Sequence, residues 1–333
     1  MTRPRRHLAG QVVALSRRCS NRCCFTRPDG TMNAIAAYAF ACAAQSYGID
    51  IHAIMVMSNH VHLIVTDVRG RRSDFMRDAM SAIAKARNAD LNRSESLWNA
   101  SSYGATLLLD RDAEERSVVY TLLNPVAAGL VERVEQWPGY MIRPCDWGKT
   151  IKVPKPDVYF GHKTPEFAAF KPKRPPGFDD MSLDEVRAHF EALLKEGEER
   201  LRRERKREKK RVLGVKRVLA TNPFSSPSKP APRGEISPRF ASKNAALLIA
   251  AIAQHRAFLT AYDQERERWL KGKKRVEFPC GTVWLRRNSP VKCRDPQAPE
   301  AGMASMMTLK PPIQCRVPQA PGVGVALMGS VAR

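Results

Sequence analysis

A hairpin of two short apolar strands is the feature that most constrains the fold of this chain of 333 residues. Residues 52–66 read His-Ala-Ile-Met-Val-Met-Ser-Asn-His-Val-His-Leu-Ile-Val-Thr, with a polar turn at 58–59 between the apolar runs. Because side chains alternate across a strand, His60 and His62 should share one face while Val61 points into the core. Two imidazoles about 7 Å apart along a strand can converge on one divalent ion.

A second segment further along the chain indicates an amphipathic helix that carries a tyrosine. Asp110 or Asp112 can cap its start. Pro125 disfavours helical geometry at the residue before it, so we expect the helix to end near Asn124. Tyr120 and Asn124 lie four residues apart and therefore share a face, while the valines and leucines around them can pack against a sheet.

Several short motifs follow one another in the first half of the chain. They read Met57-Ser-Asn-His-Val-His-Leu63, then Leu97-Trp98, then Tyr120-x-x-x-Asn-Pro-Val-x-Ala-Gly-Leu-Val131. Together with residues 16–22, they resemble the REP-associated tyrosine transposases, the single-tyrosine branch of the histidine–hydrophobic–histidine DNA-cutting superfamily. The resemblance covers roughly residues 5–145. It implies the fold of that family and a DNA-cutting activity.

The resemblance implies Tyr120 as a nucleophile that cuts single-stranded DNA near a hairpin and stays linked to it through a 5′-phosphotyrosine. A free phenol has a pKa of about 10, so a divalent metal beside the phosphate would offset the developing charge. His60, His62 and Asn124 are the expected ligands of Mg²⁺ or Mn²⁺, and imidazole favours Mn²⁺. Related branches often carry glutamine at the third ligand position. His52 shares the parity of the pair and is expected to be structural.

Two other functions stay open at this point. The first is a non-catalytic, domesticated DNA-binding protein with a vestigial metal site, although the joint retention of His60, His62 and Tyr120 argues against it. The second is a metal-dependent nuclease that uses water instead of tyrosine. A trapped covalent protein–DNA adduct would separate both from a transposase. The sequence does not decide between a monomer and a homodimer.

The charge predicts a polyanionic partner, because the net charge is +23 and the pI is about 10.1. Residues 1–150 carry 19 basic and 14 acidic side chains, a net +5, whereas residues 151–333 carry 37 and 19, a net +18. Residues 199–211 hold nine basic and three acidic side chains, which fits either a solvated helix or a phosphate-binding one. The predicted DNA contacts are Arg17, Arg18, Arg22, Arg200, Arg202, Arg203, Arg205, Lys206, Arg207, Lys209, Lys210 and Arg211.

The apolar patterns of the first half predict the order strand–helix–strand–strand–helix–strand–helix. This order fits an α+β fold with a ferredoxin-like antiparallel sheet and helices on one face, followed by a mainly helical basic extension and a disordered tail. The expected divisions are 1–150 (catalytic domain), 151–178 (linker), 179–220 (basic helical region), 221–240 (linker), 241–288 (small helical and strand accessory region) and 289–333 (disordered tail).

Targeting signals are not evident, so we expect a cytoplasmic protein without a membrane partner. No uninterrupted run reaches the roughly 18 apolar residues of a membrane span. The basic N-terminus lacks the apolar core of a secretory signal. The eight cysteines are scattered, and no second pair at zinc spacing follows Cys19, Cys23 and Cys24, which predicts free thiols in a reducing compartment.

Overall fold

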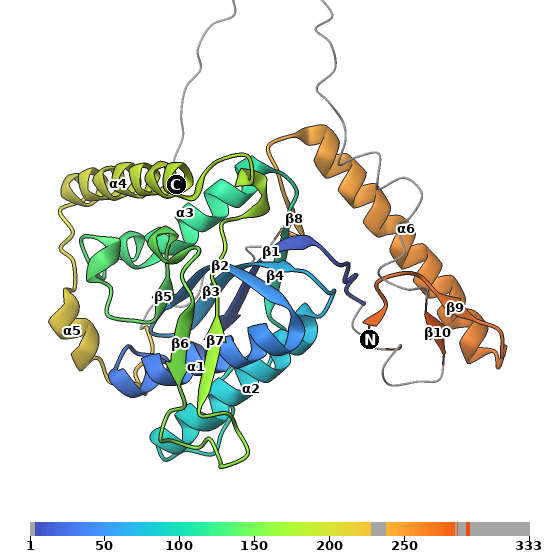
Figure 1. Ribbon diagram of the computed structural model, residues 1–333, viewed down its shortest axis with the longest axis horizontal. Helices are drawn as coiled ribbons and strands as arrows, with labels where there is room; N and C mark the ends of the chain where they lie inside the picture. The colour runs from blue at the N-terminus through green and yellow to red at the C-terminus, as the bar shows by residue number, and fades with distance from the viewer. Residues whose placement is uncertain (1–3, 228–237, 284, 286–290, 294–333) are drawn as a thin grey trace, which may run out of the picture. The chain divides into compact units, whose positions relative to one another are not determined.

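A six-stranded sheet organises the chain, of which the computed structural model describes residues 4–227, 238–283, 285 and 291–293. The strand order is β5-β2-β3-β1-β4-β8 (Figure 1). All neighbours pair antiparallel except β4 and β8, which are parallel. The strands are β1 (Gln11–Arg18), β2 (Ile49–Val56), β3 (His60–Asp67), β4 (Gly104–Leu108), β5 (Met141–Ile142) and β8 (Phe240–Ala241).

The remaining elements confirm the predicted α+β class and the predicted order of the first half. The helices are α1 (Gly30–Tyr47), α2 (Arg72–Asp90), α3 (Arg111–Ala127), α4 (Leu183–Arg207), α5 (Val215–Ala220) and α6 (Ala245–Leu270). Short 3₁₀ turns are η1 (Ser20–Arg22), η2 (Val134–Gln136), η3 (Pro144–Asp146) and η4 (Pro176–Phe178). Two small ladders consist of β6 (Ile151–Pro154) with β7 (Phe167–Phe170), and of β9 (Glu277–Phe278) with β10 (Lys292–Cys293).

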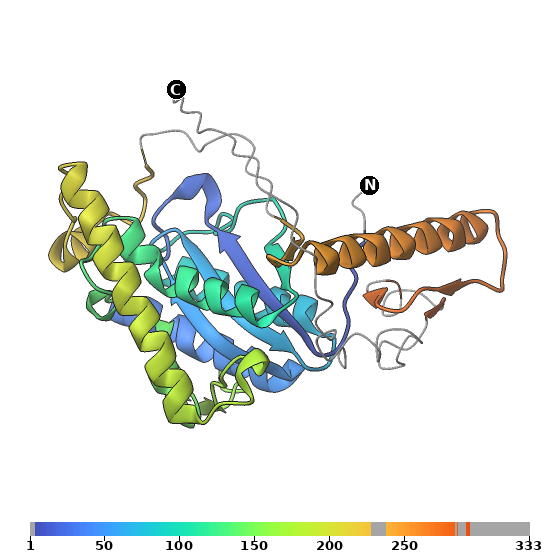
Figure 2. The same cartoon turned by 90° about the horizontal axis from the view of Figure 1, so that it is seen from above.

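Helices cover both faces of the sheet, whereas the sequence predicted them on one face only. Alternate residues of β2 explain the difference, because both of its faces are apolar. Ile54 and Val56 belong to the core that packs against α1 and α2. Ala53 and Met55 belong to the core that packs against α3 and α4. A strand that is buried on both sides needs cover on both sides, and α3 and α4 supply the second layer (Figure 2).

Helix α3 does not end at Asn124, as the sequence predicted, but continues through Pro125 to Ala127. Proline has no N–H to donate to the Thr121 carbonyl, and its ring crowds that carbonyl. Pro125 and the next residue, Val126, are buried in the second core layer, which stabilises the extra turn. The helix stops where Gly129 takes a left-handed conformation with φ of 68°.

Two segments of the second half depart from the sequence expectation. Residues 151–178, expected as a linker, contain the β6–β7 hairpin, which packs through Val153 and Ala168 against α1. The basic tract 199–211 is helical only as far as Arg207, and α4 packs on α3. The expected tail 289–333 lies outside the described residues except for 291–293.

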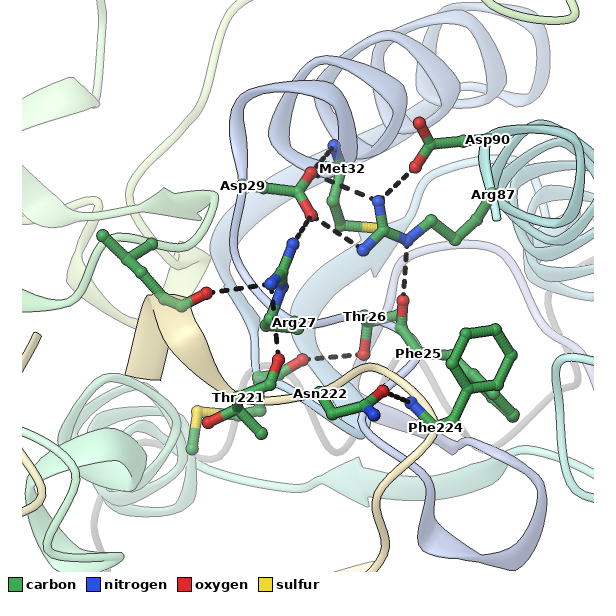
Figure 3. Close-up of polar contacts among 12 residues, drawn as sticks. Phe25, Thr26, Arg27, Asp29, Met32, Arg87, Asp90, Thr221, Asn222 and Phe224 are labelled. Carbon is green, nitrogen blue, oxygen red and sulfur yellow. Dashed lines mark hydrogen bonds and ion pairs between the residues drawn. The ribbon is translucent and has the colours of Figure 1, made fainter. Parts of the chain in front are cut away.

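The end of α5 and the irregular residues 221–225 that follow it lie beside the start of α1 (Figure 3). The Arg27 guanidinium donates to the carbonyls of Leu219 (2.9 Å) and Thr221 (3.3 Å). Asp29 caps α1 through the Met32 N–H (2.7 Å) and pairs with the buried Arg87 at 2.8 Å. The second half is therefore joined to the first by specific polar contacts, and the described residues belong to one compact unit.

Helix α6 is the one helix in the described part of the chain that is long and apolar enough to cross a membrane, judged by length and composition alone. Its apolar residues do not form one uninterrupted run, because Gln254 and Arg256 lie among them. One such helix is weak evidence of a membrane span. Its buried Phe258 packs beside His255 and Tyr262, and the Arg6 guanidinium lies 5.8 Å from the Phe258 ring.

We predict that Val61→Asp lowers the free energy of unfolding by about 3 kcal/mol or more, because it places an unpaired carboxylate in the core. Val61 is fully buried. The matched control is Val68→Asp just after β3, where the side chain is 44% exposed and the change should cost less than about 0.5 kcal/mol. Urea denaturation measures both. Equal losses for the two variants would contradict the burial of Val61.

Candidate active site

Strand β3 presents two histidines to the face of the sheet that α3 covers. His60 pairs with Arg18 and His62 with Ser16 of β1, while Val61 between them lies in the opposite core layer. The two imidazole ring centroids lie 4.9 Å apart, with the rings nearly perpendicular. The alternation of the strand thus brings both imidazoles to one place, as the sequence predicted.

Asn59 holds His60 in one tautomer, and sequence reasoning did not single it out. The Asn59 amide nitrogen donates to the Arg22 carbonyl (3.1 Å), so its oxygen faces the other way. That oxygen lies 2.6 Å from Nδ1 of His60 and accepts the Nδ1–H bond. The proton is thereby fixed on Nδ1, which leaves the Nε2 lone pair for a ligand. The Ser-Asn turn before the histidine pair was the available signal, but only the fold supplies the Arg22 carbonyl.

Helix α3 brings Tyr120 and Asn124 to the histidines. Nδ2 of Asn124 lies 3.4 Å from Nε2 of His62, and the ring centroids of Tyr120 and His62 lie 5.9 Å apart. Tyr120 is 63% exposed, so its phenol is open to a large substrate. Rotation of the Asn124 amide about its last side-chain bond would turn its oxygen toward His62. The four residues that the sequence singled out therefore meet at one site.

Burial keeps both histidines of the site neutral near pH 7. It lowers the pKa of His60 to about 4, assisted by the Arg18 guanidinium and opposed by a hydrogen bond with the Asn124 side chain. It lowers the pKa of His62 to about 3, assisted by His60 and then by Arg18. A metal binds the neutral imidazole, so this electrostatic setting suits a ligand pair.

The donor set is small but chemically suited to a divalent ion. Within the described ranges, no group of three or more histidine, cysteine, aspartate or glutamate side chains could hold a metal ion. A site here therefore depends on His60, His62 and the amide of Asn124. Two imidazoles and one amide oxygen leave further coordination positions to substrate and water, which fits Mn²⁺ or Mg²⁺.

The three arginines predicted as DNA contacts near β1 differ in their surroundings. Arg17 is half-buried and donates to the backbone carbonyls of Asn99 (2.8 Å) and Ser101, so it fixes a loop. Arg18 is exposed and lies opposite His60. The carbonyl of Arg22 accepts the Asn59 bond. Of these three arginines, Arg18 is thus the exposed one that lies beside His60.

The basic side chains of residues 199–211 fall into two groups: some pack against the protein, and the others face solvent. Arg205 is buried, and its guanidinium donates to the Val126 carbonyl (2.9 Å) and to Glu132 (2.8 Å). Arg202 is half-buried, 3.9 Å from the same carboxylate. The other predicted contacts of this tract face solvent: Arg200, Arg203, Lys206, Arg207, Lys209, Lys210 and Arg211.

A pocket of about 360 Å³ opens beside the η1 turn, whose Arg22 carbonyl holds Asn59. No motif in the sequence indicates this pocket, because its walls come from two distant segments. They are Ser20, Asn21, Phe25, Arg93, Glu95, Ser96, Asn99 and Ala100.

Comparison with known proteins places transposases among the similar structures. No protein-family model matches the sequence, and no curated protein matches it. One similar structure is a REP-associated tyrosine transposase bound to a REP hairpin, with 19% identity and a TM-score of 0.37, over 44% of this chain and 85% of that one. Another is a putative transposase from Deinococcus radiodurans R1, with 20% identity and a TM-score of 0.25, over 32% of this chain and 84% of that one.

His52 lies away from the site and is structural, as the sequence predicted. Its ring is fully buried; Nδ1–H donates to the Lys173 carbonyl (2.8 Å), and Nε2 accepts from the Thr66 hydroxyl (2.7 Å). Burial lowers its pKa to about 4, partly opposed by the Lys173 hydrogen bond and by Asp50.

We predict an acid-sensitive contribution of His52 to stability. Its folded-state pKa of about 4 lies below the ordinary histidine pKa of 6.5. Its contribution is therefore present above pH 6.5 and is lost as the pH falls toward 4. In His52→Gln, the slope of unfolding free energy against pH should flatten in this window by roughly 1 kcal/mol per pH unit. The control His162→Gln removes an exposed histidine and should keep the wild-type slope. Equal slopes for wild type and His52→Gln would contradict the prediction.

Proposed function

We propose that this protein is a transposase-like enzyme that cuts and rejoins single-stranded, hairpin-forming DNA through a covalent bond to Tyr120. One observation carries the proposal. The exposed phenol of Tyr120 stands one helical turn from Asn124, on a helix that packs over the His60–His62 pair. Nucleophile and expected ligands therefore share one surface that a phosphodiester can reach.

The chemistry needs no water and conserves the phosphodiester energy. The phenolate oxygen of Tyr120 attacks the phosphorus and forms a tyrosine–phosphate bond. The bond between phosphorus and the 3′ oxygen breaks, and that oxygen takes up a proton from solvent, which balances the proton that the phenol gave up to solvent, and leaves as a 3′-hydroxyl. The 5′-phosphate stays on Tyr120. Attack of a 3′-hydroxyl on this phosphotyrosine reverses the step and joins strands.

His60, His62 and Asn124 would hold the divalent ion, Mg²⁺ or Mn²⁺. When bound, such an ion polarises a phosphate oxygen and offsets the charge that develops on it. Asn59 orients His60 through the Nδ1–H bond. The neutral state of both imidazoles keeps their lone pairs available at neutral pH.

The exposed basic side chains of α4 support a DNA partner. Arg203, Lys206 and Arg207 lie in solvent on the helix that packs against α3. Such side chains hold phosphates without reading sequence. DNA bound along α4 would thus be attached to the same two-helix layer that carries Tyr120.

We predict that Tyr120→Phe abolishes the covalent adduct and leaves DNA binding within a few-fold of wild type. The change removes only the phenolic oxygen. The protein is incubated with a pool of hairpin-forming single-stranded oligonucleotides in the presence of Mn²⁺, and adducts are separated on a denaturing gel. The matched control is Tyr159→Phe, which alters another exposed tyrosine and should still form the adduct.

Three outcomes would contradict this proposal in different ways. An adduct that persists in Tyr120→Phe would mean that another residue is the nucleophile. A cut oligonucleotide without attached protein, dependent on the metal, would identify a nuclease that uses water. Binding without any cutting in the wild type would identify a non-catalytic DNA-binding protein.

We also predict that the combined change of Arg203, Lys206 and Arg207 to Gln weakens DNA binding and lowers its salt dependence. Each lost phosphate contact should reduce the slope of log K against log salt by roughly 0.7 on single strands. A titration with NaCl measures the slope for both proteins. The control changes the exposed Lys271, Lys273 and Lys274 to Gln, which removes equal charge elsewhere. Equal slopes for the two triple variants would mean that the α4 face does not contact phosphate.

A further inference from the structure

Arg205 stands out in the basic tract because it points inward. It is 9% exposed, whereas its neighbours Arg203, Lys206 and Arg207 face solvent. A buried guanidinium does not contact DNA phosphates unless α4 first leaves α3. Arg205 instead contacts the end of α3, the helix that carries Tyr120.

The contact is made at the C-terminal end of α3. Nη1 of Arg205 donates to the Val126 carbonyl (2.9 Å), and Nη2 donates to Glu132 (2.8 Å) just beyond the helix. A cation is favoured at this end of a helix because the last carbonyls carry partial negative charge. The planar guanidinium bonds to the helix with one nitrogen and to the segment after it with another. The single ammonium nitrogen of a lysine does not reproduce this geometry.

The last turn of α3 needs such support. Pro125 donates no hydrogen bond to the Thr121 carbonyl, so the turn lacks one of its backbone bonds. Asn124, the expected third ligand, lies in this weakened turn, one residue before Pro125. Movement here would shift the Asn124 amide relative to His62, from which it is only 3.4 Å away.

Contacts along α4 hold α3 at other points as well. Near its start, His189 of α4 lies 2.6 Å from Glu115. In the middle, Gly197 is packed so closely that an added Cβ would lie 2.3 Å from Leu123. After α4, the Leu213 N–H donates to the Gly129 carbonyl (2.8 Å). Arg205 adds a side-chain hydrogen bond to the carbonyl of Val126, two residues after Asn124.

We propose that Arg205 is a positioning residue, which holds the last turn of α3 so that Asn124 and Tyr120 keep their places beside the histidines. The inference rests on the proposed function for its consequence on rate, but its effect on α3 does not. In this role Arg205 acts through the Val126 carbonyl and Glu132, and it makes no contact with the DNA.

The test compares Arg205→Ala and Arg205→Lys with the matched control Lys195→Ala in the full chain. Lys195 is an exposed residue of α4 with the same charge. For each protein we would measure adduct formation at saturating concentration of the oligonucleotide recovered from the wild-type adduct, its dissociation constant, and amide hydrogen exchange in the free protein. Arg203→Ala serves as a reference for the loss of a solvent-facing cation.

Arg205→Ala should slow adduct formation at saturation by roughly tenfold to a hundredfold and leave the dissociation constant unchanged. Exchange of the Ala128 and Gly129 amides, which bond to the Asn124 and Val126 carbonyls, should become faster. Arg205→Lys should give a rate and an amide exchange between those of Arg205→Ala and wild type, because lysine offers one nitrogen where arginine donates from two. Lys195→Ala should match wild type in all three measurements. Arg203→Ala should instead raise the dissociation constant.

Two results would overturn the proposal. One is weaker DNA binding in Arg205→Ala with an unchanged rate at saturation, which would make Arg205 a phosphate contact. The other is unchanged exchange in the last turn of α3. If Arg205→Ala does not fold, Arg205→Lys decides by the same two criteria. If the wild type forms no adduct, the proposed function fails, and the exchange measurement still decides whether Arg205 holds α3.

Discussion

The alternation of side chains along β3 is the constraint on which the rest of the structure depends. Odd-numbered residues such as Val61 and Leu63 enter the core against α1 and α2. Even-numbered residues face α3, with His60 and His62 at one end and Ile64 in the second core layer. A shift of register by one residue would turn the histidines into the core layer of α1 and α2 and the valine toward α3. The same apolar packing that stabilises the sheet therefore also fixes which residues reach the site.

Local signals allowed much of the first half to be predicted. The Ser58–Asn59 turn divides two strands as expected, and Asp110 caps α3 by accepting from the Ala113 N–H at 2.7 Å. These features depend on residues a few positions apart, so the sequence contains all the partners. The meeting of His62 with Tyr120 and Asn124 was inferred from a family resemblance, since nothing local joins β3 to α3.

Tertiary packing explains the features in which the structure differs from the sequence predictions. Pro125 was expected to end α3, but burial of the next residue, Val126, in the second core layer outweighs one missing hydrogen bond. Residues 151–178 were expected as a linker because their composition is rich in proline and lysine, yet Val153 and Ala168 find an apolar surface on α1. The orientation of Asn59 depends on the Arg22 carbonyl, 37 residues away in the chain. Such partners become visible only when the chain is folded.

The inward orientation of Arg205 follows from the spacing of the buried residues along α4. The amino-acid composition of the basic tract does not reveal this spacing. The buried positions of this helix are Val186, Phe190, Leu194, Gly197 and Arg205, and the half-buried Leu201 lies among them. Their steps of three and four residues trace one helical stripe, and Arg205 is its last member. A tract of nine basic residues suggests that all of them bind DNA. One face of a packed helix, however, contacts the rest of the protein and is not available to DNA. On α4 that face meets α3 at its last turn, where an arginine can satisfy both a carbonyl and a carboxylate. The same helix thus exposes cations on one side and holds the helix of Tyr120 on the other.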